Sequence, residues 1–443
     1  MAHIKRQYLF ISLLCAVALS SAQPKELSLD ECVAQALQKN TNILMAKTDV
    51  EFAERKRDEI TAKLLPQVFV SADYRYYNDL PTQLMPLSVF GGPVGAYKEA
   101  QFGVPHVLNG NIQGTMPIYN QTILSGRTTA AIGTELSEYQ YKKTREDVVL
   151  DVSITYYNAQ IVAHQIIFLQ GNIKNLEQLI ATTTLLYQNQ MAKQTDADKV
   201  KLQKSILDAQ VTTADANYQR IIGLLKFQIG ISQNDSIQIQ AQTSAVPMPT
   251  AGDSPLSTEI IIAQKMQQLL QSEMDGMYAA RYPTLAVYGV YGTNGYATTG
   301  DKSFQKFFPV SFVGLQFSLP LFDGGTISAK VDQKTLELQK AALKEKLTTE
   351  KNSMDKTNLQ NQLRAHRQTV AMQEENITLA NTLYAQTQLQ FTEGVANISD
   401  VLQADSALRD AQTNYLTALA KYTMTELEWK KAAGILLQGE SIQ

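Results

Sequence analysis

The chain has 443 residues, with 39 basic and 42 acidic side chains and a formal net charge of −3. This balance excludes the strongly basic surface on which nucleic-acid-binding proteins depend. Two cysteines occur, and only Cys32 lies beyond the predicted export signal, so an intrachain disulfide scaffold is excluded as well.

Residues 1–22 have the pattern of an export signal. Two basic residues precede an apolar run from Tyr8 to Leu19, and small residues up to Ala22 offer a cleavage site. The run is short for a membrane-spanning helix, so a retained anchor is the less favoured alternative. No later segment has about eighteen consecutive apolar residues, so entry into a membrane would require a closed β-barrel.

Two helices are predicted before the first strand. Ser28 and Glu31 have the spacing of a capping box, which predicts a short helix through Leu37. A polar Asn-Thr-Asn segment interrupts the pattern, and a second helix is expected over 43–64. Pro66 ends this helix, because the residue before a proline is displaced from the helical region.

Polar and apolar residues then alternate over 67–77 and again over 107–117. Each segment is about ten residues long with one apolar face, as in the strands of transmembrane barrels. Residues 79–106 between them are rich in proline and glycine and are expected to form a long loop. A soluble β-sandwich would show the same alternation, but here only two strands lie between long helices.

A helical pattern without proline follows from about residue 122 to 187. At about 1.5 Å per residue it makes a rod of roughly 100 Å, which favours a coiled coil or a helical barrel. Residues 189–196 are predicted to form a turn. The next helix carries a heptad seam from Val200 to Leu225 and ends at Gly230.

The second half, residues 257–437, repeats this order of elements and leaves a tail at 438–443. In order, the expected elements are a helix over 257–280, strands over 284–293 and 309–319, a long helix to about residue 390, a turn at 392–400 and a final helix to Gly434.

Landmarks of the two halves keep a constant spacing, which indicates a duplication. Pro320 lies 203 residues after Pro117, and Asp400 lies 204 residues after Asp196. Residues 23–235 therefore form the first repeat, and a linker over 236–256 joins it to the second.

Prolines mark each predicted change between helix and strand. Pro66 and Pro283 precede strands, whereas Pro117 and Pro320 are expected to end them, since proline donates no ladder hydrogen bond. After Pro320 come Asp323, Gly324 and Gly325, and this turn sequence predicts a sharp change of direction before the long helix. Pro66 and Pro283 are 217 residues apart, so the first hairpin loop is the longer by about fourteen residues.

Four strands in one chain cannot close a barrel, and an open sheet edge is not tolerated in lipid. Several copies must therefore contribute strands, with a trimer of twelve strands as the natural solution and a dimer of eight as the next. The predicted fold is mainly α with a transmembrane β-barrel. It consists of a duplicated repeat of a strand hairpin plus a long helix, continued by a helical barrel.

These motifs also resemble the TolC-type outer-membrane efflux proteins. The segments that carry the resemblance are Leu65-Pro66, Tyr282-Pro283, Leu319 to Gly325, and Gly394 followed by Asp400 to Ala404. The resemblance covers about residues 26–436. It implies a trimeric duct in the outer membrane of a Gram-negative bacterium, with a twelve-stranded barrel and a long periplasmic α-barrel. Such a duct passively conducts what an inner-membrane pump of the RND or ABC type and a periplasmic adaptor, the membrane fusion protein, deliver for efflux or type I secretion.

The resemblance also assigns roles to the two helical turns, here called the tip turns, at 189–196 and 392–400. It implies that they contact the adaptor and form the closable end of the duct. The residues expected to contact the adaptor are Gln190, Met191, Lys193, Gly394, Val395 and Ala396. The glycine expected in each turn is present as Gly394, and Gln190 stands in its place in the first repeat.

The constriction is expected at Asp400, with Asp196 and Gln403 as further candidates. By resemblance, three copies of Asp400 would form an acidic ring that favours cations. The family's second acid is replaced by Gln403, and the positions of its closing Arg and Tyr are held by Ala396 and Phe391, so the closing network is expected to differ. The competing interpretation is structural, because both aspartates stand at helix starts, where a carboxylate caps free N–H groups.

No enzymatic function is indicated. The histidines lack metal-ligand spacing, and neither a phosphate-binding loop nor a nucleophile elbow occurs, so no cofactor or metal is expected. The alternative function from another class is a soluble periplasmic coiled-coil adaptor or structural protein, which would need no paired strands.

Overall fold

The computed structural model describes residues 25–240, 256–298, 300, 304 and 306–437. The predicted export signal, the tail and most of the predicted linker lie outside these residues. The chain forms two compact units, one of Met1–Asp49, Glu138–Ala263 and Glu345–Gln443, the other of Val50–Ser137 and Gln264–Lys344.

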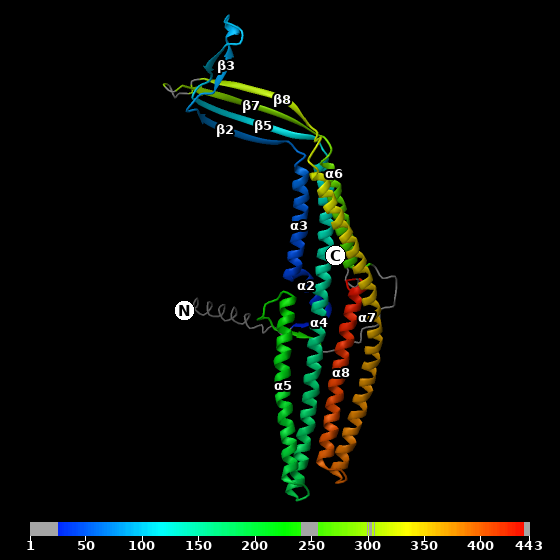
Figure 1. The fold of residues 1–443 in the computed structure, drawn as a ribbon. Coiled ribbons are helices and arrows are strands. Elements are labelled where there is room, and N and C mark those ends of the chain that lie inside the picture. Colours follow the sequence, from blue (N-terminus) through cyan, green and yellow to red (C-terminus); the bar gives the residue numbers. More distant parts are fainter. Residues whose placement is uncertain (1–24, 241–255, 299, 301–303, 305, 438–443) are drawn as a thin grey trace, which may run out of the picture. The chain divides into compact units, whose positions relative to one another are not determined.

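Seven α-helices make up most of the described residues (Figure 1). They are α2 (Leu29–Lys39), α3 (Thr41–Ala62), α4 (Gln121–Gln188), α5 (Gln194–Gln228), α6 (Thr258–Ala279), α7 (Thr326–Thr392) and α8 (Ile398–Ala432). Within the described ranges, none of these helices carries an apolar stretch long enough to cross a membrane.

Local signals fix where the first two helices begin and end. The capping box is confirmed, because Glu31 N–H donates to Ser28 Oγ at 3.2 Å and Ser28 N–H donates to Glu31 Oε2 at 2.9 Å. Asn40 ends α2, and its Oδ1 accepts from Asn42 N–H at 2.9 Å at the start of α3. The same amide donates to the Gln228 carbonyl at 2.7 Å, which ties this break to the end of α5.

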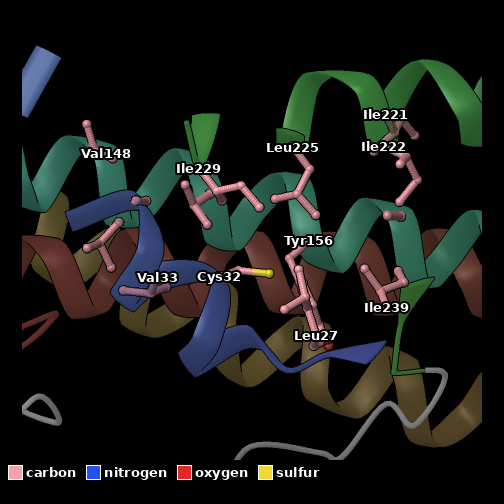
Figure 2. Close-up of a cluster of buried hydrophobic side chains, with 14 of the residues drawn as sticks. Leu27, Cys32, Val33, Val148, Tyr156, Ile221, Ile222, Leu225, Ile229 and Ile239 are labelled. Carbon is pink, nitrogen blue, oxygen red and sulfur yellow. The ribbon is translucent and has the colours of Figure 1, made fainter. Parts of the chain in front are cut away.

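A first buried cluster lies where α2 packs against α4 and α5 (Figure 2). Strand β1 (Lys25–Leu27) pairs in parallel with β6 (Ile237–Ile239) beside it, and the Tyr156 hydroxyl donates to the Leu27 carbonyl at 3.1 Å. The predicted linker over 236–256 therefore begins with a short strand that the sequence analysis did not include. A strand of three residues is too short to show an alternating pattern in the sequence.

A second buried cluster joins α4 and α5 to α7 and α8 in the same unit. The heptad positions Val200 and Leu207 of α5 and Leu408 of α8 are fully or almost fully buried in it. This packing is the seam that the sequence predicts, with both helix pairs contributing to one core.

The other unit contains a four-stranded antiparallel sheet in the order β2-β5-β7-β8 (Figure 1). Its strands are β2 (Gln67–Tyr76), β5 (His106–Asn120), β7 (Thr284–Ala297) and β8 (Phe307–Ser318). The central pair, β5 and β7, joins the two repeats, and β2 and β8 form the edges.

The predicted loop over 79–106 is instead a second, smaller hairpin. Strand β3 (Thr82–Pro86) pairs antiparallel with β4 (Tyr97–Gln101), and the 3-10 helix η1 (Leu87–Phe90) stands between them. The prediction is wrong because the prolines and glycines lie at the ends and in the turn, where they do not interrupt the ladder.

The prolines at the strand ends behave differently in the two repeats. Pro66 and Pro283 directly precede β2 and β7, as predicted, and Pro320 follows the end of β8. Pro117, however, does not end its strand, because β5 continues to Asn120 past an irregularity in the register just after the proline. Such an irregularity tolerates a residue without a donor.

Helix α7 begins after a turn that only glycine accommodates without strain. Gly324 and Gly325 have φ of 68° and 86°, in the left-handed region. Asp323 Oδ1 accepts from Gly325 N–H at 3.1 Å and its Oδ2 from Ile327 N–H at 2.6 Å, so this carboxylate caps the helix. In the first repeat α4 starts immediately after β5, and Asn120 Oδ1 accepts from Ile123 N–H at 3.2 Å.

Candidate functional site

The second tip turn ends α7 with a left-handed residue. Gly394 has φ of 74°, and its N–H donates to the Phe391 carbonyl at 3.1 Å. Val395 N–H donates to the Gln390 carbonyl at 2.8 Å. This pair of bonds is a Schellman cap, in which glycine is favoured because it adopts positive φ without strain.

The first tip turn has the same cap with a different residue at its centre. Gln190 has φ of 60°, which makes it the one non-glycine residue with positive φ in the described chain. Its N–H donates to the Tyr187 carbonyl at 2.9 Å, and Met191 N–H donates to the Leu186 carbonyl at 2.8 Å. Gln190 therefore occupies the glycine position at a cost in backbone strain.

Both candidate aspartates cap the helix that follows their turn. Asp400 Oδ2 accepts from Asn397 N–H at 3.0 Å, while Asn397 Oδ1 accepts from Asp400 N–H at 3.1 Å. Asp196 Oδ2 accepts from Lys193 N–H at 3.3 Å, and its Oδ1 lies 3.5 Å from Lys199 Nζ. The carboxylates thus have a structural role at the helix N-termini, where the helix dipole also favours negative charge.

Large apolar side chains are exposed at both tip turns. Met191 is 76% exposed and Val395 is 79% exposed. Gln190, Lys193 and Gly394 are exposed as well, whereas Ala396 is half-buried against the helix core. Each tip turn thus presents one strongly exposed apolar side chain to its surroundings.

The structure brings four candidates of the second repeat together in one groove. Val395, Ala396, Asp400 and Gln403 line a hollow of about 400 Å³, whose other wall is formed by α7 residues such as Leu383. The groove is built from α7, the second tip turn and α8. The candidates of the first repeat belong to their own turn between α4 and α5.

A buried polar cluster below the tips was not predicted from the sequence. Arg409 Nε donates to Asp405 Oδ2 at 3.0 Å, and the side chain of Asp405 is 0% exposed. With its amide oriented to satisfy both groups, Gln203 accepts from the two terminal guanidinium nitrogens of Arg409 at 2.8 and 2.9 Å. The signal in the sequence is the opposite charges at i and i+4 inside the heptad seam, next to buried Ala404 and Leu408.

Burial dominates the electrostatics of this cluster. Removal from water raises the pKa of Asp405, although the neighbouring Arg409 acts in the opposite direction. Burial and the charge of Asp405 raise the pKa of Tyr384, on α7, to about 12. Among the described residues, Asp405 Oδ1 and the Tyr384 hydroxyl lack hydrogen-bond partners. Hydrogen bonds from Arg409 to Gln203 therefore connect α8 to α5, whereas Tyr384 of α7 joins them through the buried hydrophobic cluster.

A second buried polar contact connects the two helix pairs. Asn172 Nδ2, on α4, donates to Gln412 Oε1, on α8, at 2.7 Å. The Asn172–Gln412 bond holds α8 to α4, and the Gln203–Arg409 bonds hold α8 to α5. Within the described part of the chain, no group of three potential metal ligands occurs.

Comparison with known proteins gives a consistent result. A model of the outer membrane efflux protein family matches residues 32–226 and 259–434. The chain is 20% identical over 423 residues to Outer membrane protein TolC of Escherichia coli (strain K12), covering 91% of this chain and 81% of that protein. It is 27% identical over 151 residues to Alkaline protease secretion protein AprF of Pseudomonas aeruginosa, 33% of this chain and 31% of that protein.

Solved structures share the fold at low sequence identity. The outer membrane protein VceC of Vibrio cholerae superimposes with a TM-score of 0.74 at 13% identity, covering 92% of this chain and 96% of that one. The CmeC outer membrane channel of Campylobacter jejuni gives a TM-score of 0.72 at 16% identity, covering 94% and 90%.

Proposed function

The chain belongs to the outer membrane efflux protein family, and we propose that three copies of it close one twelve-stranded barrel. The protein is an outer-membrane exit channel for efflux and type I secretion. Family membership removes the alternative of a soluble periplasmic adaptor or structural protein.

The observation that carries the proposed trimer is the pair of open edges on the four-stranded sheet. Among the described strands, β2 pairs only with β5 and β8 only with β7, so each edge of the sheet presents unpaired backbone groups. Such groups are not tolerated in lipid. Pairing β2 of one copy with β8 of the next removes both edges, and three copies exceed the eight strands of the smallest single-chain barrels.

Side-chain exposure supports the same arrangement. Alternate residues of β8, namely Val313, Leu315 and Phe317, are apolar and largely exposed, as a strand with one lipid-facing side requires. Helix α7 carries a row of exposed apolar residues, which are Leu336, Leu343, Leu347, Met354, Leu379 and Leu383. A face of this size needs a partner, and a neighbouring copy supplies one.

The trimer is tested by fractionation and by a seam crosslink. We expect the protein in the outer-membrane fraction as a large oligomer in mild detergent. Cysteines at Ser71 on β2 and Phe312 on β8 should crosslink between copies, whereas a cysteine at Gly289 on the central strand β7 should not. A soluble monomer, or equal crosslinking of the central strand, would refute the closed trimer.

A periplasmic adaptor and an inner-membrane pump of the RND or ABC type are the partners that we propose. The support is the exposure of Met191 and Val395 at the tip turns and the secretion role in the name of AprF. Cysteines at Lys193 or Ala396 should crosslink to a co-expressed adaptor. A cysteine at Tyr296 is the matched control, and equal labelling of both sites would contradict the assignment of the tips.

We also propose that Asp400 contributes to ion selectivity. Its carboxylate is exposed and lines the groove of the second tip turn, so three copies could form an acidic ring. The Asp400→Asn variant keeps an oxygen for the bond from Asn397 N–H and removes only the charge. Cation selectivity in planar bilayers should fall in this variant, and unchanged selectivity would exclude Asp400 from the constriction.

A further inference from the structure

The hairpin of β3 and β4 forms an arm that projects from the end of the sheet (Figure 1). We define the arm as residues 77–105, which connect β2 to β5. Its base is held in place, because Tyr77 N–H donates to the Pro105 carbonyl at 2.8 Å. The Tyr74 hydroxyl is hydrogen-bonded to Nδ1 of His106 at 2.6 Å directly below it.

The outer part of the arm is apolar and exposed. Residues 80–97 contain no charged side chain. Five large apolar residues in this segment are more than half exposed, and they are Leu84, Val89, Phe90, Val94 and Tyr97. Val94, at the turn, is 93% exposed. Several exposed apolar side chains gathered in one uncharged segment are typical of an interaction site.

The arm also lacks a support of its own. Its ladder has five residue pairs, from Thr82 opposite Gln101 to Pro86 opposite Tyr97. An isolated two-stranded hairpin is at best marginally stable in water, so a regular ladder of this length implies that another surface packs against it.

We propose that the arms of the three copies pack against one another through these apolar tips and form a cap over the exit of the channel. This inference rests on the proposed trimer. The arm leaves the sheet from β2, the edge strand that would face the neighbouring copy, so its contact continues the proposed interface. Tethering to one trimer raises the effective concentration of the tips to about the millimolar range, which favours contacts too weak to form between free molecules.

The low charge of the arm and the presence of one arm per chain both favour the other arms, rather than a lipid surface, as its partner. Binding to an anionic headgroup layer calls for a cluster of basic residues. The arm has one, Lys98, and Glu99 follows it. Only 9 residues separate β7 from β8, against 29 between β2 and β5, so each chain supplies one long arm. Around a threefold axis, three equal apolar tips can meet so that each tip contacts the other two.

The contact is tested by disulfide formation between arms of the full-length trimer. Under copper-phenanthroline oxidation, Val94→Cys should give disulfide-linked dimers within the trimer. Thr82→Cys, at the base of the same arm, is the matched control and should give far fewer, and Cys32 is buried and does not interfere. If the trimer forms but Val94→Cys does not link, the cap is refuted while the channel assignment stands. If no trimer forms, the proposed assembly fails first and the cap fails with it.

A second measurement separates the arms from a lipid partner. An environment-sensitive dye on Val94→Cys should be shielded in the detergent-solubilised trimer. Shielding only in vesicles of lipopolysaccharide and phosphatidylethanolamine would overturn the cap.

The double variant Phe90→Ser/Val94→Ser should raise the time-averaged conductance in planar bilayers, whereas Thr82→Ser should not. Equal conductance of the double variant and the wild type would contradict a closing role.

Discussion

Removal of Arg409 tests whether the buried polar cluster holds the helix pairs together. In Arg409→Leu, the fully buried Asp405 carboxylate loses Arg409, which is its only ion-pair partner among the described residues. Removing one member of a buried ion pair typically costs about 3–5 kcal/mol. Because 19% of the Arg409 side chain is exposed, we expect the lower end, about 3 kcal/mol of unfolding free energy per chain.

The companion variant Asp405→Asn should be much milder. The amide keeps an oxygen for the bond from Arg409 Nε and removes a charge whose burial is unfavourable, so a change within about 1 kcal/mol is expected. In that background Arg409→Leu no longer strands a carboxylate. The two changes should therefore be non-additive by about 2 kcal/mol, as measured in a double-mutant cycle.

The assay is the thermal midpoint of the purified trimer in detergent for the wild type, the two single variants and the double variant. Arg409→Leu should melt lowest, and the double variant should recover most of the loss. Thr413→Ala, one turn along α8 and exposed, is the control and should lie close to the wild type. If Arg409→Leu and the double variant melt alike, the buried charge is not what Arg409 stabilises.

The same cluster predicts a dependence on pH with a definite sign. Burial raises the pKa of Asp405 above its unfolded value, so the folded chain binds the proton more readily. The free energy of unfolding therefore falls as pH rises from the unfolded pKa through the folded pKa. Without Arg409, whose charge lowers this pKa, the effect should be larger. The deficit of Arg409→Leu relative to the wild type should shrink on acidification, and a constant deficit would contradict the argument.

Three further changes probe the tip turns, each by the same melting assay. Gln190→Gly should stabilise the trimer by about 0.5–1 kcal/mol per chain, because the left-handed conformation is strained for glutamine. Gly394→Ala should destabilise it by about 1 kcal/mol for the same reason, and a shift of equal sign in both variants would be incompatible with this explanation. Asn397→Ala removes the cap of α8 and should cost about 1 kcal/mol, with exposed Ser399→Ala as the control that should be nearly neutral.

Features set by neighbouring residues could be predicted from the sequence. The capping box of Ser28 and Glu31 is such a feature, and helix α4 lies within a residue of the predicted span at each end. The heptad seam of α5 is another, because its period is visible along one chain segment. The duplication also allowed the order of the elements to be predicted, since each landmark occurs in both repeats.

Features that depend on a partner element could not be predicted in the same way. Pro117 looks like a strand end in the sequence, yet β7 keeps β5 in the sheet to Asn120 beyond it. The arm was missed because its two strands are short and pair only with each other. Asp405 resembles an ordinary exposed helix residue, and only the packing of α5 and α7 against α8 buries it. In each case the deciding contact is non-local.

The two repeats share one plan but differ at every place where function is proposed. The first has the strained Gln190 turn, the direct passage from β5 into α4, and the arm. The second has the relaxed Gly394 turn, the double-glycine passage before α7, and the groove with Asp400. If two similar repeats alternate around the proposed trimer, identical turns would give six nearly equivalent tips. The differences would instead leave three tips of each kind, with Met191 exposed in one set and Val395 in the other, so the proposed adaptor would meet two chemically different surfaces.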